Sequence, residues 1–232
     1  MAAIASDKLE MVSRLVDLEA DINAADDRGE TALSLACRRG KTDLFRVLIA
    51  KGADITARTK EGQTLLMMAT AVGNKEIVSR LLDLGADVNQ KDRNGRTALF
   101  LIGGNEPLEI AGLLLKKGAN ASATDEHGTS LLMEECRRKG RIEMVRLLLE
   151  RKAGPDIVSK TGVTALGVAE HPEIRKMLKD LGAKELPEDS ERIRRIVWYG
   201  SINLLSYGSA QESFMRLKSP NIAHELMKDL EN

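Results

Sequence analysis

Five glycines recur along the chain at an almost constant interval. They are Gly29, Gly62, Gly95, Gly128 and Gly162, of which the first four are 33 residues apart and the last follows after 34. Self-similarity at a fixed period of this size is the signature of a solenoid, in which each unit packs mainly on its neighbours. The stretch 26–54, DDRGETALSLACRRGKTDLFRVLIAKGAD, holds one complete unit, and the rest of the chain repeats its pattern.

Every unit contains the same succession of short signals. A D-x-x-G turn or a close relative comes first, followed by a hydroxyl residue such as Thr31 or Thr64, which is placed to cap a helix. A second segment carries apolar residues at i, i+1, i+4 and i+5, as in Leu44, Phe45, Leu48 and Ile49, which is the stripe of an amphipathic helix. The pattern therefore predicts an all-α fold of helix pairs separated by projecting turns.

Glycine at the end of the second segment adds to this prediction. Gly52, Gly85 and Gly118 stand where a helix commonly ends in a left-handed residue. Aromatic residues make up only 3% of the chain, so the core must be built mainly from small aliphatic side chains. Such residues suit thin layers that stack closely.

The unit resembles the ankyrin repeat. The segments LLDLGADVN (81–89) and DRNGRT (92–97) follow the consensus of that family nearly letter for letter, and the resemblance covers about residues 7–183. It implies an ankyrin solenoid with β-turn loops that binds a protein or peptide on its concave face. No copy keeps the Pro-Leu-His of the consensus, so the imidazole that ties neighbouring turns in the family is missing here.

The expected organisation is an ankyrin array over 1–183, a polar linker over 184–190 and a helical extension over 191–232. Within the array we expect a half repeat at 1–22, repeats near 23–55, 56–88, 89–121 and 122–155, and a short capping repeat at 156–183. The three helices expected in the extension resemble a single armadillo-type unit. The other interpretation is that these helices dock on the last ankyrin unit and shield its apolar face.

Two interpretations of the start of the chain remain open, a natural cap and a cut inside a longer array.

In the third unit, GGNEP (103–107) should weaken the end of one helix, because each glycine costs about 1 kcal/mol relative to alanine, and Pro107 should open the next helix.

No catalytic or metal-binding constellation is recognisable. None of the three histidines stands near a cysteine or acid at metal-ligand or nucleophile spacing, and Cys37 and Cys136 occupy equivalent core positions in two repeats. We expect no enzyme activity and no cofactor. The two cysteines form no disulfide framework, and the sequence contains no apolar run long enough to span a membrane and no secretory signal. We therefore expect a cytoplasmic or nuclear protein, and a monomer.

Function is therefore expected on the surface that the turns and the first helices share. Position in the repeat places a set of mostly basic residues there: Arg28, Arg38, Arg39, Arg58, Lys60, Arg93, Arg96, Asn105, His127, Arg137 and Arg138. Since the whole chain has a formal net charge of zero, the acids are expected elsewhere, which leaves a basic face for an acidic protein or peptide. The alternative is a solvated face without a specific partner.

Other functional interpretations stay open. The array could be a regulatory or targeting domain of a larger protein, such as an enzyme, a channel or an armadillo-containing protein. Nucleic-acid binding through the arginines is disfavoured by the neutral charge of the chain. Ankyrin units similar to these can also be hydroxylated at an asparagine that matches Asn89, although that residue has the structural task of bracing its turn first.

Overall fold

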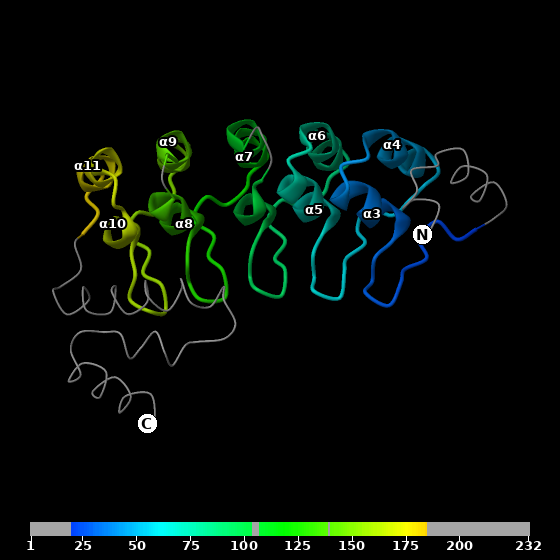
Figure 1. Cartoon of the computed structure of the whole chain (residues 1–232), viewed down its shortest axis with the longest axis horizontal. Helices are drawn as coiled ribbons and strands as arrows, with labels where there is room; N and C mark the ends of the chain where they lie inside the picture. The colour runs from blue at the N-terminus through cyan, green and yellow to red at the C-terminus, as the bar shows by residue number, and fades with distance from the viewer. Residues whose placement is uncertain (1–19, 104–106, 139, 185–232) are drawn as a thin grey trace, which may run out of the picture.

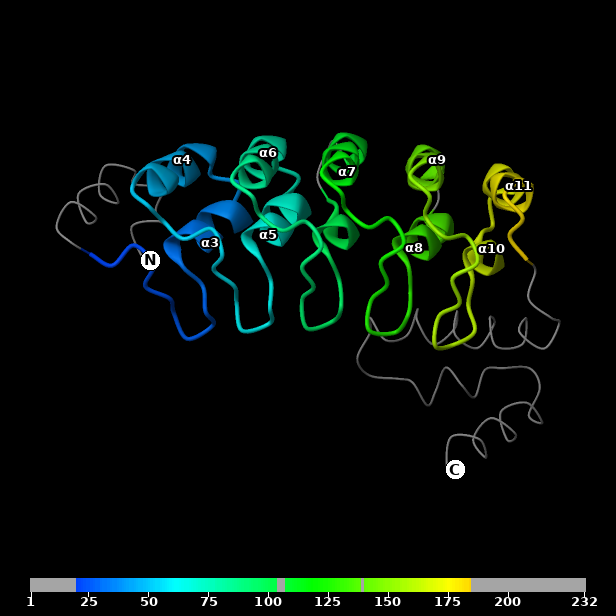
Figure 2. The same ribbon diagram turned by 180° about the vertical axis from the view of Figure 1, so that it is seen from behind.

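The helices of the chain stack in two rows, with a row of turns on one side (Figure 1, Figure 2). The computed structural model describes residues 20–103, 107–138 and 140–184. The row next to the turns, here called the inner row, consists of α3 (Ala32–Arg38), α5 (Leu65–Val72), the 3₁₀ helix η1 (Ala98–Leu101), α8 (Leu131–Arg137) and α10 (Ala165–Val168). The outer row consists of α4 (Thr42–Ala50), α6 (Lys75–Asp83), α7 (Pro107–Lys116), α9 (Ile142–Glu150) and α11 (Pro172–Asp180).

Within the described residues no strand occurs, and the predicted all-α solenoid is confirmed. Each helix pair is preceded by one turn. The turns are numbered here in chain order as turn 1 (26–30), turn 2 (59–63), turn 3 (92–96), turn 4 (125–129) and turn 5 (159–163).

The first residue of each turn stabilises the turn itself. Asp26 Oδ1 accepts hydrogen bonds from the backbone amides of Arg28 and Glu30 at 2.9 and 2.8 Å, and Asp92 Oδ1 does the same in turn 3. The amides of Glu30 and then Arg28 lower the pKa of Asp26 below its ordinary value. The repeated glycine of each turn has a φ between 74° and 77°, a conformation that only glycine adopts readily. Both features give these residues a structural role.

Hydroxyl side chains begin the inner helices, as the sequence predicts. Thr31 Oγ1 accepts from the Ser34 amide, Thr64 Oγ1 from the Met67 amide and Ser130 Oγ from the Met133 amide, at 3.2 to 3.3 Å. The predicted apolar stripes of the outer helices are also observed, because Leu44, Phe45 and Leu48 of α4 are buried. The same holds for Ile77, Val78, Leu81 and Leu82 of α6.

The third unit departs from the others. Its inner helix η1 is a single turn of 3₁₀ helix that begins at Thr97 without a side-chain cap. Just beyond this helix the backbone lies so close to α5 that a Cβ on Gly103 would stand 2.2 Å from the carbonyl oxygen of Ala71. The chain therefore passes directly against α5 at Gly103 and enters α7 at Pro107, which confirms the predicted start of that helix.

Backbone hydrogen bonds join each turn to the next. The amides of Lys60, Arg93, Glu126 and Lys160 donate to the carbonyl oxygens of Arg28, Glu61, Asn94 and His127, each at 2.9 Å. We call these four bonds the turn rungs. They need no particular side chain, so adjacent turns are tied together even though the consensus histidine is missing.

A second series of hydrogen bonds joins the loops that follow the outer helices. Asn89 Nδ2 donates to Gly118 O at 2.9 Å, and its Oδ1 accepts from the Asn120 amide at 2.8 Å. Asn23 and Ser122 make equivalent bonds to the Asp54 and Gly154 amides. At the matching position Thr56 bonds only to Asp54 of its own loop, so the loops after α4 and α6 lack this brace.

The last unit described has a short inner helix. Helix α10 has four residues, and the loop after α9 contains Lys152 at φ 61° where the earlier loops have Gly52, Gly85 and Gly118. The linker beyond Lys184 and the extension 191–232 lie outside the described residues, as do residues 1–19. The armadillo-like unit and the start of the array therefore stay predictions.

Replacing Thr56 by Asn should supply the missing brace, through bonds to Gly85 O and the Asp87 amide. We expect a gain in unfolding free energy of about 1 kcal/mol and a rise in Tm of about 2–4 °C, measured by thermal and urea denaturation. Asn89→Ala is the matched control and should lower stability by about 1–2 kcal/mol. An unchanged or lower Tm for Thr56→Asn would contradict the role given to this brace.

Replacing Lys152 by Gly should also stabilise the protein. A side chain in the left-handed region costs about 1–2 kcal/mol, part of which is offset by the greater freedom of glycine in the unfolded chain. The expected net gain is about 0.5–1 kcal/mol in urea denaturation. Arg151→Gly, one residue earlier at φ −94°, relieves no strain and should be destabilising; equal effects of the two substitutions would refute the explanation.

Candidate functional site

Four cations on the first three turns have side chains that make no hydrogen bond or ion pair among the described residues. They are Arg28 of turn 1, Arg58 and Lys60 at turn 2 and Arg93 of turn 3, and all four are exposed. We call them the turn-tip cluster. Charged groups without an internal partner are available to an external one, so this cluster is the strongest candidate for a binding site in the described part of the chain.

The turn rungs hold the cluster in place. Lys60 donates its amide to Arg28 O, and Arg93 donates its amide to Glu61 O, which fixes the three turns side by side (Figure 1). These cations therefore stand on a backbone that is already ordered before any partner arrives. Such preorganisation reduces the ordering cost of association.

One carboxylate lies within the cluster. The pKa of Glu61 is below its ordinary value, because its own backbone amide and then the Thr59 hydroxyl donate to it, while Arg93 and Arg28 add favourable charge. Both arginines therefore act on the same carboxylate from neighbouring turns. A carboxylate of a partner would compete with Glu61 for them.

Other predicted site arginines already have acidic partners. Arg38 forms an ion pair with Glu30, Arg96 with Asp92 at 3.2 Å, and Arg138 with Glu135 at 2.8 Å. The expectation that the acids lie elsewhere is therefore wrong for these three positions, since turns and inner helices supply both charges. Paired arginines of this kind contribute less to the recognition of an external anion.

Glu135 is a buried charged residue that the sequence did not lead us to expect at the candidate site. It is only 3% exposed and stands where α3 and α5 have the buried Ala36 and Ala69. Arg138 bonds to its Oε1, and Arg141 Nε lies 3.6 Å from its Oε2. Glu135 is buried and Arg138 partly neutralises it, so substitutions of Arg138 would affect folding as well as binding. The sequence did contain a signal for this buried charge, because Glu135 occupies a repeat position that is alanine in the first two units.

The remaining predicted residues are dispersed. Arg137 is exposed at the end of α8, Arg39 is exposed near the end of α3, and Asn105 lies outside the described residues. In turn 4, His127 Nε2 lies 3.6 Å from Glu126 Oε1, a contact that becomes an ion pair only when the imidazole is protonated. Turn 4 thus carries Asp125 and Glu126, which separate the cations of turns 1 to 3 from Lys160 of turn 5.

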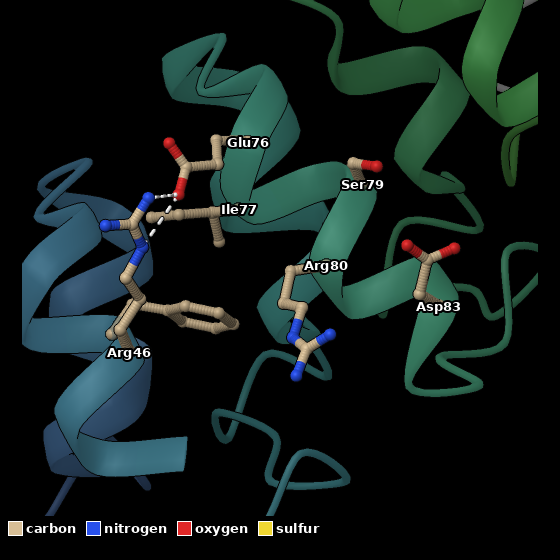
Figure 3. A pocket seen from close by; sticks show the side chains of 7 residues that line it. Arg46, Glu76, Ile77, Ser79, Arg80 and Asp83 are labelled. Carbon is tan, nitrogen blue, oxygen red and sulfur yellow. Dashed lines mark hydrogen bonds and ion pairs between the residues drawn. The ribbon is translucent and has the colours of Figure 1, made fainter. Parts of the chain in front are cut away.

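On the outer row, charges of opposite sign join neighbouring helices. Arg46 of α4 pairs with Glu76 of α6, Lys117 with Asp83 at 3.0 Å and Arg146 with Glu173 at 3.0 Å. Between α4 and α6 lies a hollow of about 380 Å3, and Figure 3 shows Arg46 and Glu76 facing each other beside it. Phe45 and Ile77 line the hollow, but both side chains are almost completely buried, so the hollow exposes little apolar surface to a ligand.

The described residues contain no group of His, Cys, Asp and Glu side chains that could hold a metal ion. No helix in the same part of the chain is long and apolar enough to cross a membrane.

Burial raises the pKa of the thiols of Cys37 and Cys136 to about 12, with Glu135 adding to the effect at Cys136. Both are free and buried, in agreement with the predicted core role.

The two thiols should be inert in the folded protein. At pH 8 a thiol with a pKa of about 12 has almost no thiolate, which is the reactive form. We expect Cys37 and Cys136 to resist a disulfide reagent such as Ellman's reagent until denaturant is added, and then to react together as the array unfolds. Fast labelling of the native protein would contradict their placement in the core.

Comparison with known families supports this description. A family model described as "Ankyrin repeats (3 copies)" matches residues 1–59 and 56–125. The crystal structure of the ankyrin repeat domain of Bcl-3, described as a unique member of the IkappaB protein family, is similar with a TM-score of 0.67 and 31% sequence identity. That similarity covers 76% of this chain and 79% of the Bcl-3 chain.

Proposed function

Because the chain belongs to the ankyrin repeat family, we propose that it is a protein-binding scaffold or adaptor whose turn-tip cluster binds an acidic segment of a partner. Ankyrin repeats are protein–protein interaction modules, so the binding role itself follows from the family. The observation that supports the finer statement is the set of four unpaired cations on three adjoining turns of a chain with zero net charge.

Charge complementarity explains how such a surface would act. Exposed cations on one edge attract an acidic partner from solution and orient it before contact, which raises the association rate. Arginine can then hold a carboxylate with two hydrogen bonds, which adds geometric selectivity. The scaffold contributes stiffness, because adjacent turns cannot move apart without breaking a turn rung.

The other predicted residues contribute to the same proposal in different ways. Arg137 and Arg39 would extend the binding surface along the inner row, and His127 would extend it along the turns. Arg38, Arg96 and Arg138 would mainly maintain the shape of the surface through their acidic partners. We propose no cofactor and no catalytic step, and we place the protein in the cytoplasm or nucleus, where thiols such as Cys37 stay reduced.

A double charge reversal tests the proposal. Lys60→Glu combined with Arg93→Glu should weaken binding of a fluorescein-labelled acidic peptide by about tenfold or more, because two attractive contacts become repulsive. Both side chains are exposed and unpaired, so Tm should stay nearly constant. Arg80→Glu combined with Lys116→Glu makes the same change of charge on the outer row and should leave the affinity unaltered.

Nucleic-acid binding would give a different outcome in the same assay. A DNA duplex that competes with the peptide, and whose affinity falls steeply with salt, would favour phosphate recognition instead. Equal peptide binding by the wild type and both double variants would contradict the assignment of the turn-tip cluster. Hydroxylation of Asn89 stays a separate prediction, and it is checked by the mass of the peptide that contains this residue after purification from cells.

A further inference from the structure

The backbone brings cations of the first two turns together at one place. The Lys60 amide donates to Arg28 O at 2.9 Å, so these two residues are neighbours across a turn rung. A Cβ on Gly29 would stand 3.0 Å from Arg58 O, which places Arg58 against the residue that follows Arg28. The two turns are therefore in direct contact at these residues (Figure 1).

Burial along the limb of turn 2 shows where its side chains point. Thr59 is 6% exposed, whereas Arg58 and Lys60 on either side of it are exposed. In an extended segment, residues two apart share one face. Arg58 and Lys60 therefore face solvent on the same side of the limb, and Arg28 stands beside Lys60 across the turn rung. We call Arg28, Arg58 and Lys60 the junction triad.

Turn 3 carries the same kind of residues at the equivalent positions without forming such a triad. Lys91 and Arg93 flank the buried Asp92. However, Lys91 Nζ donates to Thr124 O at 2.9 Å. Arg93 stands across its turn rung from Glu61 and adds favourable charge to that carboxylate. Of the junctions between described turns, only that of turns 1 and 2 places three unpaired cations together.

The carboxylates near the junction triad have partners in their own turns or lie on another limb. Asp26 Oδ1 accepts from the amides of its own turn, and Glu61 accepts from its own amide and the Thr59 hydroxyl. Both also interact with the charge of Arg28, but hydrogen bonds lower the pKa of each more strongly. Asp27 lies on the limb of turn 1 that is not bonded to turn 2. The triad is therefore open to an anion from outside.

Three like charges on adjoining limbs favour an anion that carries more than one charge. Like charges opposite each other on paired strands are destabilising, and an anion that bridges them reverses this effect. A carboxylate brings a single charge. A phosphate monoester brings a charge of about −1.5 to −2 and three strong acceptor oxygens, so it can bond to several cations at once.

We propose that the junction triad binds the phosphate group of a phosphorylated serine or threonine within the acidic segment of a protein partner. This inference rests on the proposed function and specifies the modification that the partner carries. Arg28 and Arg58 can each hold phosphate oxygens with two hydrogen bonds, and Lys60 adds a compact charge beside them. Arg93, one turn further on, stays available to a carboxylate of the same segment. Phosphorylation of the partner would then strengthen its binding.

Three peptides that differ at one central position test the proposal by fluorescence anisotropy on the full chain. That position holds phosphoserine, glutamate or serine within the same acidic sequence. We expect the phosphoserine peptide to bind the wild type about tenfold tighter than the glutamate peptide, and the serine peptide to bind most weakly. Arg58→Gln should reduce the ratio to about twofold. Its Tm should stay nearly constant, because the Arg58 side chain is exposed.

Lys91→Gln is the matched control, since Lys91 occupies in turn 3 the position that Arg58 occupies in turn 2. It should leave the ratio of the two affinities at its wild-type value. Arg93→Gln should weaken the phosphoserine and glutamate peptides alike, because Arg93 meets a carboxylate that both contain. A ratio that falls in either of these variants as far as in Arg58→Gln would contradict the placement of the phosphate between turns 1 and 2.

The outcomes separate this inference from the proposed function. If the phosphoserine and glutamate peptides bind equally and both depend on Lys60 and Arg93, the acidic partner stands and the phosphate site is wrong. If no peptide depends on Lys60 and Arg93, the proposed function itself fails. Phosphatidylserine vesicles or a DNA duplex that bind more tightly than the phosphopeptide, and lose affinity in Arg58→Gln, would assign the site to another phosphate carrier and overturn the inference.

Discussion

The hydrogen bond from the backbone of one turn to the backbone of the next is the interaction on which the surface of this protein depends. Each turn rung measures 2.9 Å and uses only main-chain atoms, so the side chains at the tips take no part in holding the turns together. Tip residues are therefore free to vary. Turns 1 to 3 each carry an unpaired cation, in turns 1 and 2 beside the acids Asp27 and Glu61, and turn 4 carries Glu126.

The solenoid could be predicted from the sequence because its strongest constraint is local. A backbone with φ near +75° is readily adopted only by glycine, so every turn leaves a glycine at a fixed interval. The hydroxyl caps and apolar stripes are local in the same sense. In the third unit GGNEP (103–107) indicates a weakened helix end, but the close approach of Gly103 to the carbonyl oxygen of Ala71 was not predictable, because it is a contact between units.

The candidate site could be predicted only in part, since the pairing of charges depends on contacts between units and across a turn. Arg28 and Arg38 look equally available in the sequence, yet Glu30 pairs with Arg38 and leaves Arg28 unpaired. Arg138 likewise holds the buried Glu135, whose place in the core is not apparent from its residue type. Position in the repeat predicts which residues share the face of turns and first helices, and the structure shows which of its arginines have acidic partners.

The most direct measurement is the chemical-shift change of backbone amides when the acidic peptide of the charge-reversal test is added to isotope-labelled protein. The account predicts that the largest changes fall on the amides of turns 1 to 3, including Lys60 and Arg93, while those of α4, α6 and α9 stay unchanged. Changes centred on the outer row, or spread evenly over both rows, would contradict the assignment of the binding surface to the turn tips.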